Sequence, residues 1–200
     1  RIIVDSTDIG NLRINIPGRH NLLDAAAAYT GAVDGLGQDP TRVLDGLFGF
    51  TGTRRRFEPK GSAAGVSVVD DYAHNPGKVA AVLAAAKGGH WKRVVCVFQP
   101  HRYSRTADLA DAFGAAFGDA DVIVVMDVYA AGEAPRPGVT GKLIVDSILL
   151  HRPWARVDWL PKRDDVLAYL RAELRPGDLC LTVGAGDITS LADDVIGVLA

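Results

Sequence analysis

The spacing of apolar residues along this chain changes near residue 59. From about residue 65 onward, short apolar runs alternate with longer segments in which apolar residues recur every three or four positions. The short runs predict buried strands and the longer segments predict helices, because side chains repeat about every two residues in a strand and about every 3.6 in a helix. We predict strands at 65–70, 93–98, 121–126, 155–159 and 179–183, and helices at 76–87, 104–117, 141–150, 163–174 and 188–199.

Two of these strands are apolar almost throughout. The runs Val94-Val95-Cys96-Val97-Phe98 and Val122-Ile123-Val124-Val125-Met126 contain no polar side chain. Strands of this kind belong to a parallel sheet that is covered on both faces. The alternation of strands and helices therefore predicts an α/β fold: a Rossmann-like, mostly parallel sheet with helices on both faces.

The first part of the chain has a different pattern. Apolar and polar residues alternate over 12–16, which predicts a half-buried strand that Pro17 and Gly18 end. Residues 21–36 and 40–48 carry helix formers with helical spacing, and Gly49 follows the second segment. We therefore place a domain boundary near Pro59, with one domain at 1–58 and a second at 59–200.

Composition narrows the class of protein. The chain has 200 residues, of which 48% are hydrophobic and 23% are charged, and its formal net charge is −2. These values are ordinary for a soluble globular protein and argue against a partner held mainly through phosphate-backbone electrostatics, such as nucleic acid. No apolar run approaches the roughly 20 residues of a membrane span. We expect a cytoplasmic protein without a membrane partner.

The two cysteines and the metal-ligating residue types offer no site. Cys96 and Cys180 each lie in an apolar run that predicts a buried strand, so we expect reduced and unreactive thiols. The sequence contains no spacing of cysteine and histidine that is typical of a metal site.

The segment 70–76, Asp-Asp-Tyr-Ala-His-Asn-Pro, is the strongest candidate for chemistry. It follows the predicted strand at 65–70, and Pro76 stands where a helix would begin. Ligands of open α/β sheets bind in the crevice outside the carboxyl ends of the strands. The alternative is a polar loop in which Asp71 or Asn75 only caps the following helix. Two aspartates, Tyr72 and His74 together favour a site.

Three further loops follow predicted strands. In 99–106, Arg102 and Arg105 are near enough to hold one carboxylate, although surface arginines are common, and Ser104 or Thr106 is a candidate helix cap. The loop 127–138 is long and rich in glycine and proline, and it contains Tyr129 and Glu133. The segment 183–188, Val-Gly-Ala-Gly-Asp-Ile, lacks the third glycine of a dinucleotide motif, so we interpret it as a tight turn capped by Asp187.

Two segments of the first domain are candidates for anion or ring binding. His20 and Asn21 lie where a helix is predicted to begin, and helix N-termini present unpaired backbone N–H groups. The alternative is that Asn21 or Asp24 caps that helix. Arg54, Arg55 and Arg56 form either a solvated surface run or a phosphate-binding group.

Taken in order, these motifs resemble the Mur ligase family of bacterial peptidoglycan synthesis. The resemblance rests on Asp-Asp-Tyr-Ala-His-Asn-Pro at 70–76, Phe-Gln-Pro-His-Arg-Tyr-Ser-Arg-Thr at 98–106 and Asp-Val-Tyr-Ala-Ala-Gly-Glu-Ala-Pro at 127–135. Pro-Gly-Arg-His-Asn at 17–21 and Arg-Arg-Phe-Glu at 55–58 are similar to the same family's adenine-side and phosphate-side motifs. In this order the motifs extend across nearly the whole chain.

The resemblance implies an ATP-dependent ligase that joins L-alanine to the carboxylate of UDP-N-acetylmuramate through an acyl phosphate. It implies that His20 and Asn21 lie against adenine, that Arg55 and Arg56 bind ATP phosphate and that Asp71 binds the ribose. It also implies a set of residues around the amino acid and the muramoyl group, in which His74 or His101 accepts the proton of the amine. This set is Tyr72, His74, His101, Arg102 and Arg105. One departure is Asp24, where the family often has an asparagine that can donate as well as accept.

The resemblance covers the end of the family's central ATPase domain and all of its C-terminal domain. The chain begins at Arg1 and contains no glycine-rich P-loop, so we expect the P-loop and the Mg²⁺ ligands in a preceding part of a longer protein, and no turnover by these residues alone. Two alternatives remain: a sibling ligase that adds murein tripeptide to the same sugar nucleotide, and a non-catalytic nucleotide-binding module. The sequence does not indicate an oligomeric state.

Overall fold

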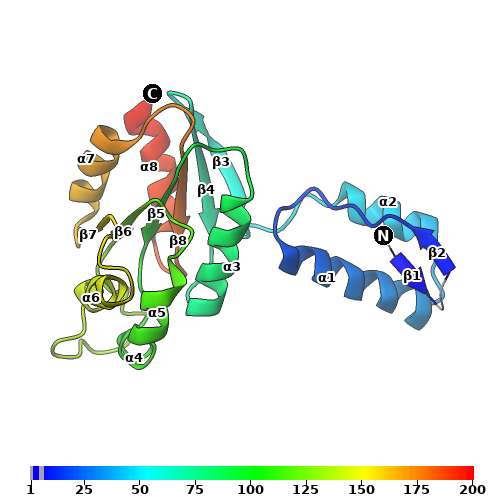
Figure 1. Ribbon diagram of the computed structural model, residues 1–200, viewed down its shortest axis with the longest axis horizontal. Coiled ribbons are helices and arrows are strands. Elements are labelled where there is room, and N and C mark those ends of the chain that lie inside the picture. The colour runs from blue at the N-terminus through cyan, green and yellow to red at the C-terminus, as the bar shows by residue number, and fades with distance from the viewer. Residues whose placement is uncertain (1, 5–6) are drawn as a thin grey trace. The chain divides into compact units, whose positions relative to one another are not determined.

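The computed structural model describes residues 2–4 and 7–200, with side chains described from Gly10 onward. The chain divides into two compact units, Arg1–Thr53 and Arg54–Ala200 (Figure 1). The division therefore lies ahead of the boundary expected near residue 59. Residues 54–58 group with the second unit because the backbone N–H of Phe57 donates to the Asp71 carboxylate and the carbonyl of Arg55 accepts from the N–H of Tyr72.

The first unit consists of a strand pair and helices. The antiparallel strands β1 (Ile2–Val4) and β2 (Thr7–Gly10) precede α1 (Arg19–Thr30), a π-helical turn (Gly31–Gly35) and α2 (Pro40–Gly49). Both helical segments are confirmed. The carboxylate of Asp39 caps α2 by accepting from the N–H of Arg42. The strand predicted at 12–16 is wrong: burial does alternate there, but the segment pairs with no described strand.

The second unit is built on one six-stranded sheet with the order β3-β4-β8-β5-β6-β7. Strands β4, β8, β5, β6 and β7 are parallel, and β3 pairs antiparallel with β4 at the edge. The mostly parallel α/β fold is confirmed. The strands are β3 (Glu58–Ala63), β4 (Val66–Asp71), β5 (Val94–Phe98), β6 (Val122–Val125), β7 (Val157–Trp159) and β8 (Leu179–Val183).

Helices cover both faces of this sheet (Figure 1). Side chains of α3 (Pro76–Lys87), α5 (Ala110–Ala116) and α6 (Gly141–His151) pack in one core, and side chains of α7 (Arg163–Glu173) and α8 (Thr189–Leu199) pack in the other. In β5, Cys96 and Phe98 face the first core and Val95 and Val97 face the second, as the pleat of a strand requires.

Two features of the second unit differ from the prediction. Strand β3 is not predicted because Pro59 and Gly61 both disfavour a strand; proline is tolerated here because β3 is an edge strand, and the register shifts between these two residues. The helix predicted at 104–117 is interrupted at Leu109, so that α4 (Tyr103–Asp108) and α5 are separate.

The cysteines lie on adjacent strands but on opposite faces. Cys96 belongs to one core and Cys180 to the other, and both are fully buried and free. Burial raises the pKa of both thiols, to about 12 for Cys180. The thiols are therefore protonated at neutral pH, which makes them unreactive as nucleophiles. Among the described residues, no helix is long and apolar enough to cross a membrane.

An ion-pair network joins the amino-terminal side of β5 to the segment ahead of β8. Arg93 donates from Nε and Nη2 to the two carboxylate oxygens of Asp178, at 3.1 and 2.6 Å, and from Nη1 to Glu173 at 2.7 Å. Burial acts to raise the pKa of Asp178, but the hydrogen bonds and charges of Arg93 and Arg175 outweigh it and lower that pKa. The raised pKa of Arg93 has the same cause, its hydrogen bonds to Asp178 first.

We expect Arg93→Met to destabilise the second unit by about 3 kcal/mol at pH 7, because it leaves the buried Asp178 carboxylate unpaired. The lowered folded-state pKa of Asp178 means that the pair stabilises the fold above the ordinary carboxyl pKa of about 4 and that this contribution disappears as the pH falls through the lowered value. The measurement is urea unfolding of the 200-residue chain from pH 7 down to pH 2, followed by tryptophan fluorescence. All 3 tryptophans lie in the second unit.

The matched control is Lys142→Met, which removes an exposed pair with Asp146 within α6. Such a pair contributes less than about 1 kcal/mol. A difference between Arg93→Met and wild type that stays constant down to pH 2, or that is no larger than the control's, would contradict the assigned role of the network.

Candidate functional site

The carboxyl ends of four neighbouring strands are in register. Asp71 at the end of β4 pairs with Val183 of β8, Val183 pairs with Phe98 of β5, and Phe98 pairs with Val125 of β6. The loops that follow these strands consequently begin side by side. They are the polar loops that the sequence singled out.

Strand β4 ends with two buried aspartates, Asp70 and Asp71. The carboxylate of Asp71 accepts from the backbone N–H groups of Phe57 and Ala73, each at 2.8 Å. Burial raises the pKa of Asp71, and these two hydrogen bonds oppose that shift. Asn75, not Asp71, caps α3 by accepting from the N–H of Lys78. The capping alternative therefore explains Asn75 and leaves Asp71 to a different role.

His74 is held by its own loop. Its Nδ1 lies 2.8 Å from the carbonyl oxygen of Tyr72, which can only accept a hydrogen bond. Nδ1 therefore carries the proton of the neutral ring, and Nε2 is left with a lone pair that can take up a proton.

His101 has the opposite tautomer because its partner is a cation. Nη1 of Arg105 lies 3.2 Å from Nδ1 of His101 and also donates to the His101 carbonyl at 3.1 Å. Arginine is always a donor, so Nδ1 of His101 accepts and its neutral ring carries the proton on Nε2. Arg105 thus orients His101, while the nearby Arg102 is exposed.

The start of α4 is capped from another loop, which the sequence did not predict. Neither Ser104 nor Thr106 is the N-cap; that position is Arg102, whose φ is 74°. The carboxylate of Glu133, from the loop after β6, accepts from the N–H of Ser104 at 2.9 Å and from its hydroxyl at 2.5 Å. Only tertiary structure brings Glu133 to this helix, because the two residues are 29 positions apart.

Tyr129 is a second residue from that loop. Its ring stacks on His101 with centroids 5.5 Å apart and an interplanar angle of 21°. Its backbone N–H donates to the carbonyl of Pro100, and its carbonyl accepts from the N–H of Arg102. The only sequence signal for Tyr129 was its presence in a long loop after a strand.

Four aromatic and imidazole rings form one row beside the carboxyl ends of the strands. We call this row the ring row; its members are Tyr72, His74, His101 and Tyr129. The centroids of Tyr72 and His74 are 5.1 Å apart, and those of His74 and His101 are 6.1 Å apart. The structure thus brings the candidate site residues of the loops after β4 and β5 together at the carboxyl ends of the strands. Arg105 lies within this group through its contact with His101.

The ring row lies in a positive environment. Burial is the first cause of the lowered pKa of His74 and of His101, and the charge of Arg105 lowers both further. Both rings are therefore predominantly neutral at pH 7. The described residues contain no group of His, Cys, Asp and Glu that could hold a metal ion.

The loop between β8 and α8 is a turn, as the sequence indicated, but Asp187 does not cap α8. Its carboxylate instead accepts from Nε2 of Gln99 at 2.8 Å, and the Gln99 Oε1 accepts from the N–H of Ile188. Gly184 has a φ of 156°, and a Cβ there would lie 2.9 Å from the Gln99 carbonyl oxygen. Glycine at this position lets the loops after β5 and β8 approach closely.

The remaining candidates are distributed over both units. Arg56 is exposed, whereas the guanidinium of Arg55 is hydrogen-bonded within the second unit. His20 and Asn21 lie at the start of α1 in the first unit, where His20 is exposed and the Asn21 amide donates to the carbonyl of Pro17 at 2.6 Å. Neither Asn21 nor Asp24 caps that helix, because the N-cap is Gly18 without a side-chain hydrogen bond.

Comparison with known proteins supplies the family. Residues 55–186 match the family model described as "Mur ligase, glutamate ligase domain". The chain belongs to the Mur ligase family. The matched residues include all four in-register strand ends and the whole ring row, which therefore lies within the family's shared domain.

Several Mur ligases are similar to this chain over most of its length. The UDP-N-acetylmuramate–L-alanine ligase of Kineococcus radiotolerans is 53% identical and aligns with 100% of this chain and 42% of its own length. The crystal structure of the UDP-N-acetylmuramate-alanine ligase of Thermotoga maritima matches with a TM-score of 0.76 at 31% identity, over 93% of this chain and 39% of its own. The murein peptide ligase of Psychrobacter arcticus matches with a TM-score of 0.69 at 20% identity, over 94% of this chain and 38% of its own, and shows the fold alone.

The chain therefore spans about two fifths of the length of the Mur ligases that it matches. These comparisons confirm the family and the fold that the sequence motifs indicated.

We predict that Arg105→Gln raises the pKa of both His74 and His101, because it removes a positive charge that lowers them. The measurement is an NMR titration of the histidine rings in the 200-residue chain. In wild type both pKa values should lie below the ordinary 6.5. Arg163→Gln, which removes an ion pair with Asp194 on α8, is the matched control. Unchanged or lowered values in Arg105→Gln would contradict the electrostatic account.

Proposed function

We propose that this chain is the C-terminal part of an ATP-dependent ligase that joins L-alanine to the carboxylate of UDP-N-acetylmuramate. The observation that carries the proposal is the ring row with Arg105 bound to it, at the carboxyl ends of the strands. The names of the relatives that align with the chain, including the one at 53% identity, support this substrate pair. Such a reaction belongs to peptidoglycan synthesis and would take place in the cytoplasm.

The proposed reaction has two steps. The carboxylate of the sugar nucleotide attacks the γ-phosphorus of ATP, and ADP leaves with the electron pair of the broken P–O bond. The amine of L-alanine then attacks the acyl carbon, and phosphate leaves from the tetrahedral intermediate as the amide forms. The protein must position the reactants, stabilise negative charge and accept one proton.

The arginines after β5 are suited to the substrate's negative charge. Arg102 is exposed at the start of α4, and its guanidinium makes no hydrogen bond within the described part of the chain. Arg105 is fixed against His101. Two guanidinium groups at this spacing can hold the carboxylate of L-alanine or the muramoyl carboxylate, since each presents a planar set of donors.

His74 is the better of the two candidates for accepting the amine's proton. Its Nε2 has a free lone pair because Nδ1 donates to the carbonyl of Tyr72. Nδ1 of His101 already accepts from Arg105, and its Nε2 carries the proton. In this arrangement His101 donates to substrate, and Tyr72 supports His74.

The ATP side of the proposal concerns Arg56 and Asp71 in the second unit and, separately, His20 and Asn21 in the first. The exposed Arg56 fits a phosphate ligand, and Asp71 accepts from two N–H groups but retains acceptor capacity for a ribose hydroxyl. His20 and Asn21 would contact adenine. Mg²⁺ would neutralise phosphate charge, but the described residues hold no cluster of metal ligands, so its ligands are expected in the rest of the complete protein.

The test is substrate-dependent ADP release by the complete protein that contains this chain. With ATP, Mg²⁺ and UDP-N-acetylmuramate present, we expect release that requires L-alanine. Release that requires murein tripeptide instead would identify the sibling ligase and contradict this proposal. ATP binding without any amino-acid-dependent release would indicate a non-catalytic module.

In the same assay, Arg102→Gln and Arg105→Gln should each raise the KM for L-alanine or for the sugar nucleotide about tenfold or more. The loss of a charged hydrogen bond costs about 1.5–3 kcal/mol, and 1.4 kcal/mol corresponds to tenfold. Arg163→Gln is the control because Arg163 pairs with Asp194 on the α7 and α8 side of the sheet. Wild-type kinetics in both variants would contradict the role given to these arginines.

A further inference from the structure

Arg55 lies in the second unit, in the short segment 54–57 that precedes β3. Its φ is 58°, and its backbone is fixed on both sides: the N–H donates to Glu58 Oε2 at 2.7 Å, and the carbonyl accepts from the N–H of Tyr72 at 2.7 Å. The side chain is therefore directed by a backbone that is already joined to β3 and to the loop after β4.

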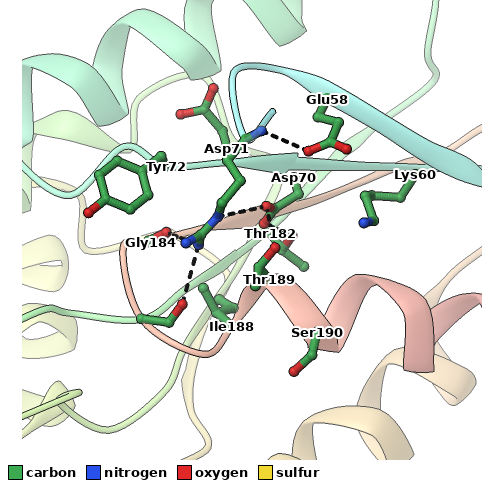
Figure 2. A network of polar contacts seen from close by, with 12 residues as sticks. Glu58, Lys60, Asp70, Asp71, Tyr72, Thr182, Gly184, Ile188, Thr189 and Ser190 are labelled. Atoms are coloured by element: carbon green, nitrogen blue, oxygen red, sulfur yellow. Dashed lines mark hydrogen bonds and ion pairs between the residues drawn. The ribbon is translucent and has the colours of Figure 1, made fainter. Parts of the chain in front are cut away.

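The guanidinium of Arg55 joins the end of β4 to the turn after β8. Its Nε donates to Asp70 Oδ2 at 3.1 Å, and its Nη2 donates to the carbonyls of Gly184 and Gly186 at 2.7 and 3.3 Å. Asp70 is fully buried, and the hydroxyls of Thr182 and Thr189 also donate to its carboxylate, each at 2.8 Å (Figure 2). This guanidinium compensates a charge that nothing else in the described residues neutralises.

The same guanidinium supports a ring of the site. Its central carbon lies 4.8 Å from the centroid of the Tyr72 ring, which is the geometry of a cation–π contact. Tyr72 in turn meets His74 edge-on at 5.1 Å, and His74 is followed by His101 and Tyr129. Arg55 therefore stands at one end of the ring row.

Tyr129, at the other end of the ring row, packs against the turn after β8, whose carbonyls accept hydrogen bonds from Arg55. Gly186 is in such close contact with Tyr129 that a Cβ on Gly186 would lie 2.6 Å from Tyr129 Cγ. The carbonyl of that same glycine accepts from Arg55. Tyr72 and Tyr129, which close the two ends of the row, are thus supported by one guanidinium and one tight turn.

We infer that Arg55 is a positioning residue that fixes the ring row for substrate, and that Arg56 alone of the pair binds ATP phosphate. If Arg55 turned toward a phosphate, the buried Asp70 carboxylate would lose its counter-ion and the carbonyls of Gly184 and Gly186 would lose a donor. A buried carboxylate without a partner is strongly unfavourable. The substrate that the ring row serves rests on the proposed function above.

The test compares Arg55→Gln with Arg56→Gln in the complete protein, with ATP and Mg²⁺ present. Arg55→Gln should raise the KM for L-alanine about tenfold or more, since small displacements of positioning groups are costly, and should leave the KM for ATP within about twofold. Arg56→Gln should show the reverse pattern. Arg163→Gln serves as the unperturbed control.

Loss of folding is separated from loss of positioning by a second variant. Arg55→Gln with Asp70→Asn removes both members of the ion pair and leaves no unpaired buried charge. It should recover the urea midpoint that Arg55→Gln loses, but it should not recover the KM for L-alanine. Recovery of both would reduce Arg55 to a stabilising residue and overturn the inference, as would a rise in the KM for ATP that matches Arg56→Gln.

A readout independent of activity distinguishes this inference from the proposed function. The chemical shifts of the His74 ring protons depend on the Tyr72 ring beside it. In the 200-residue chain, recorded at a pH well above the His74 pKa so that the ring is neutral in every variant, they should shift in Arg55→Gln and in the double variant, but much less in Arg56→Gln, whose charge acts on that pKa. Unchanged shifts would overturn the positioning role even in an active enzyme. If the variants show these shift changes but the wild-type complete protein releases no ADP in response to L-alanine, the proposed function alone is overturned.

Discussion

The site depends on the hydrogen-bond register of a parallel sheet. Asp71, Val183, Phe98 and Val125 are paired across β4, β8, β5 and β6, so four loops leave the sheet at the same level. The strands are buried on both faces, and a slip of one residue would exchange the side chains of the two cores. The burial that stabilises the fold therefore also fixes the starting points of the loops that carry the candidate site residues.

The charged groups at the carboxyl ends of these strands lie in two layers. The buried layer contains Asp70 and Asp71, whose carboxylates are satisfied by Arg55, by hydroxyls and by backbone N–H groups. The outer layer contains arginines and two histidines whose lowered pKa values leave both rings predominantly neutral at pH 7. Such an edge attracts carboxylates and phosphates while it retains a neutral imidazole that can take up a proton. This combination is what amide formation from an activated carboxylate requires.

The sequence predicted the parts of this arrangement that depend on local pattern. The apolar strands, most helices and the polar loops after β4, β5 and β6 all follow from the spacing of residues and from the family motifs. The sequence did not predict β3, because Pro59 and Gly61 disfavour a strand in a local pattern. It also did not predict the cap of α4, because Glu133 comes from a different loop. The contacts of Arg55 were also hidden: its guanidinium meets Gly184, 129 positions away, so its neighbours in sequence carry no sign of that partner.

The central claim is that substrate binds at the carboxyl ends of these strands, against the ring row. A crystal structure of the complete protein with UDP-N-acetylmuramoyl-L-alanine, the product of the proposed reaction, tests it most directly. The account predicts a product carboxylate within hydrogen-bonding distance of Arg102 or Arg105 and the new amide beside His74. A product bound at the opposite edge of the sheet, or with no contact to the loops after β4 and β5, would contradict it.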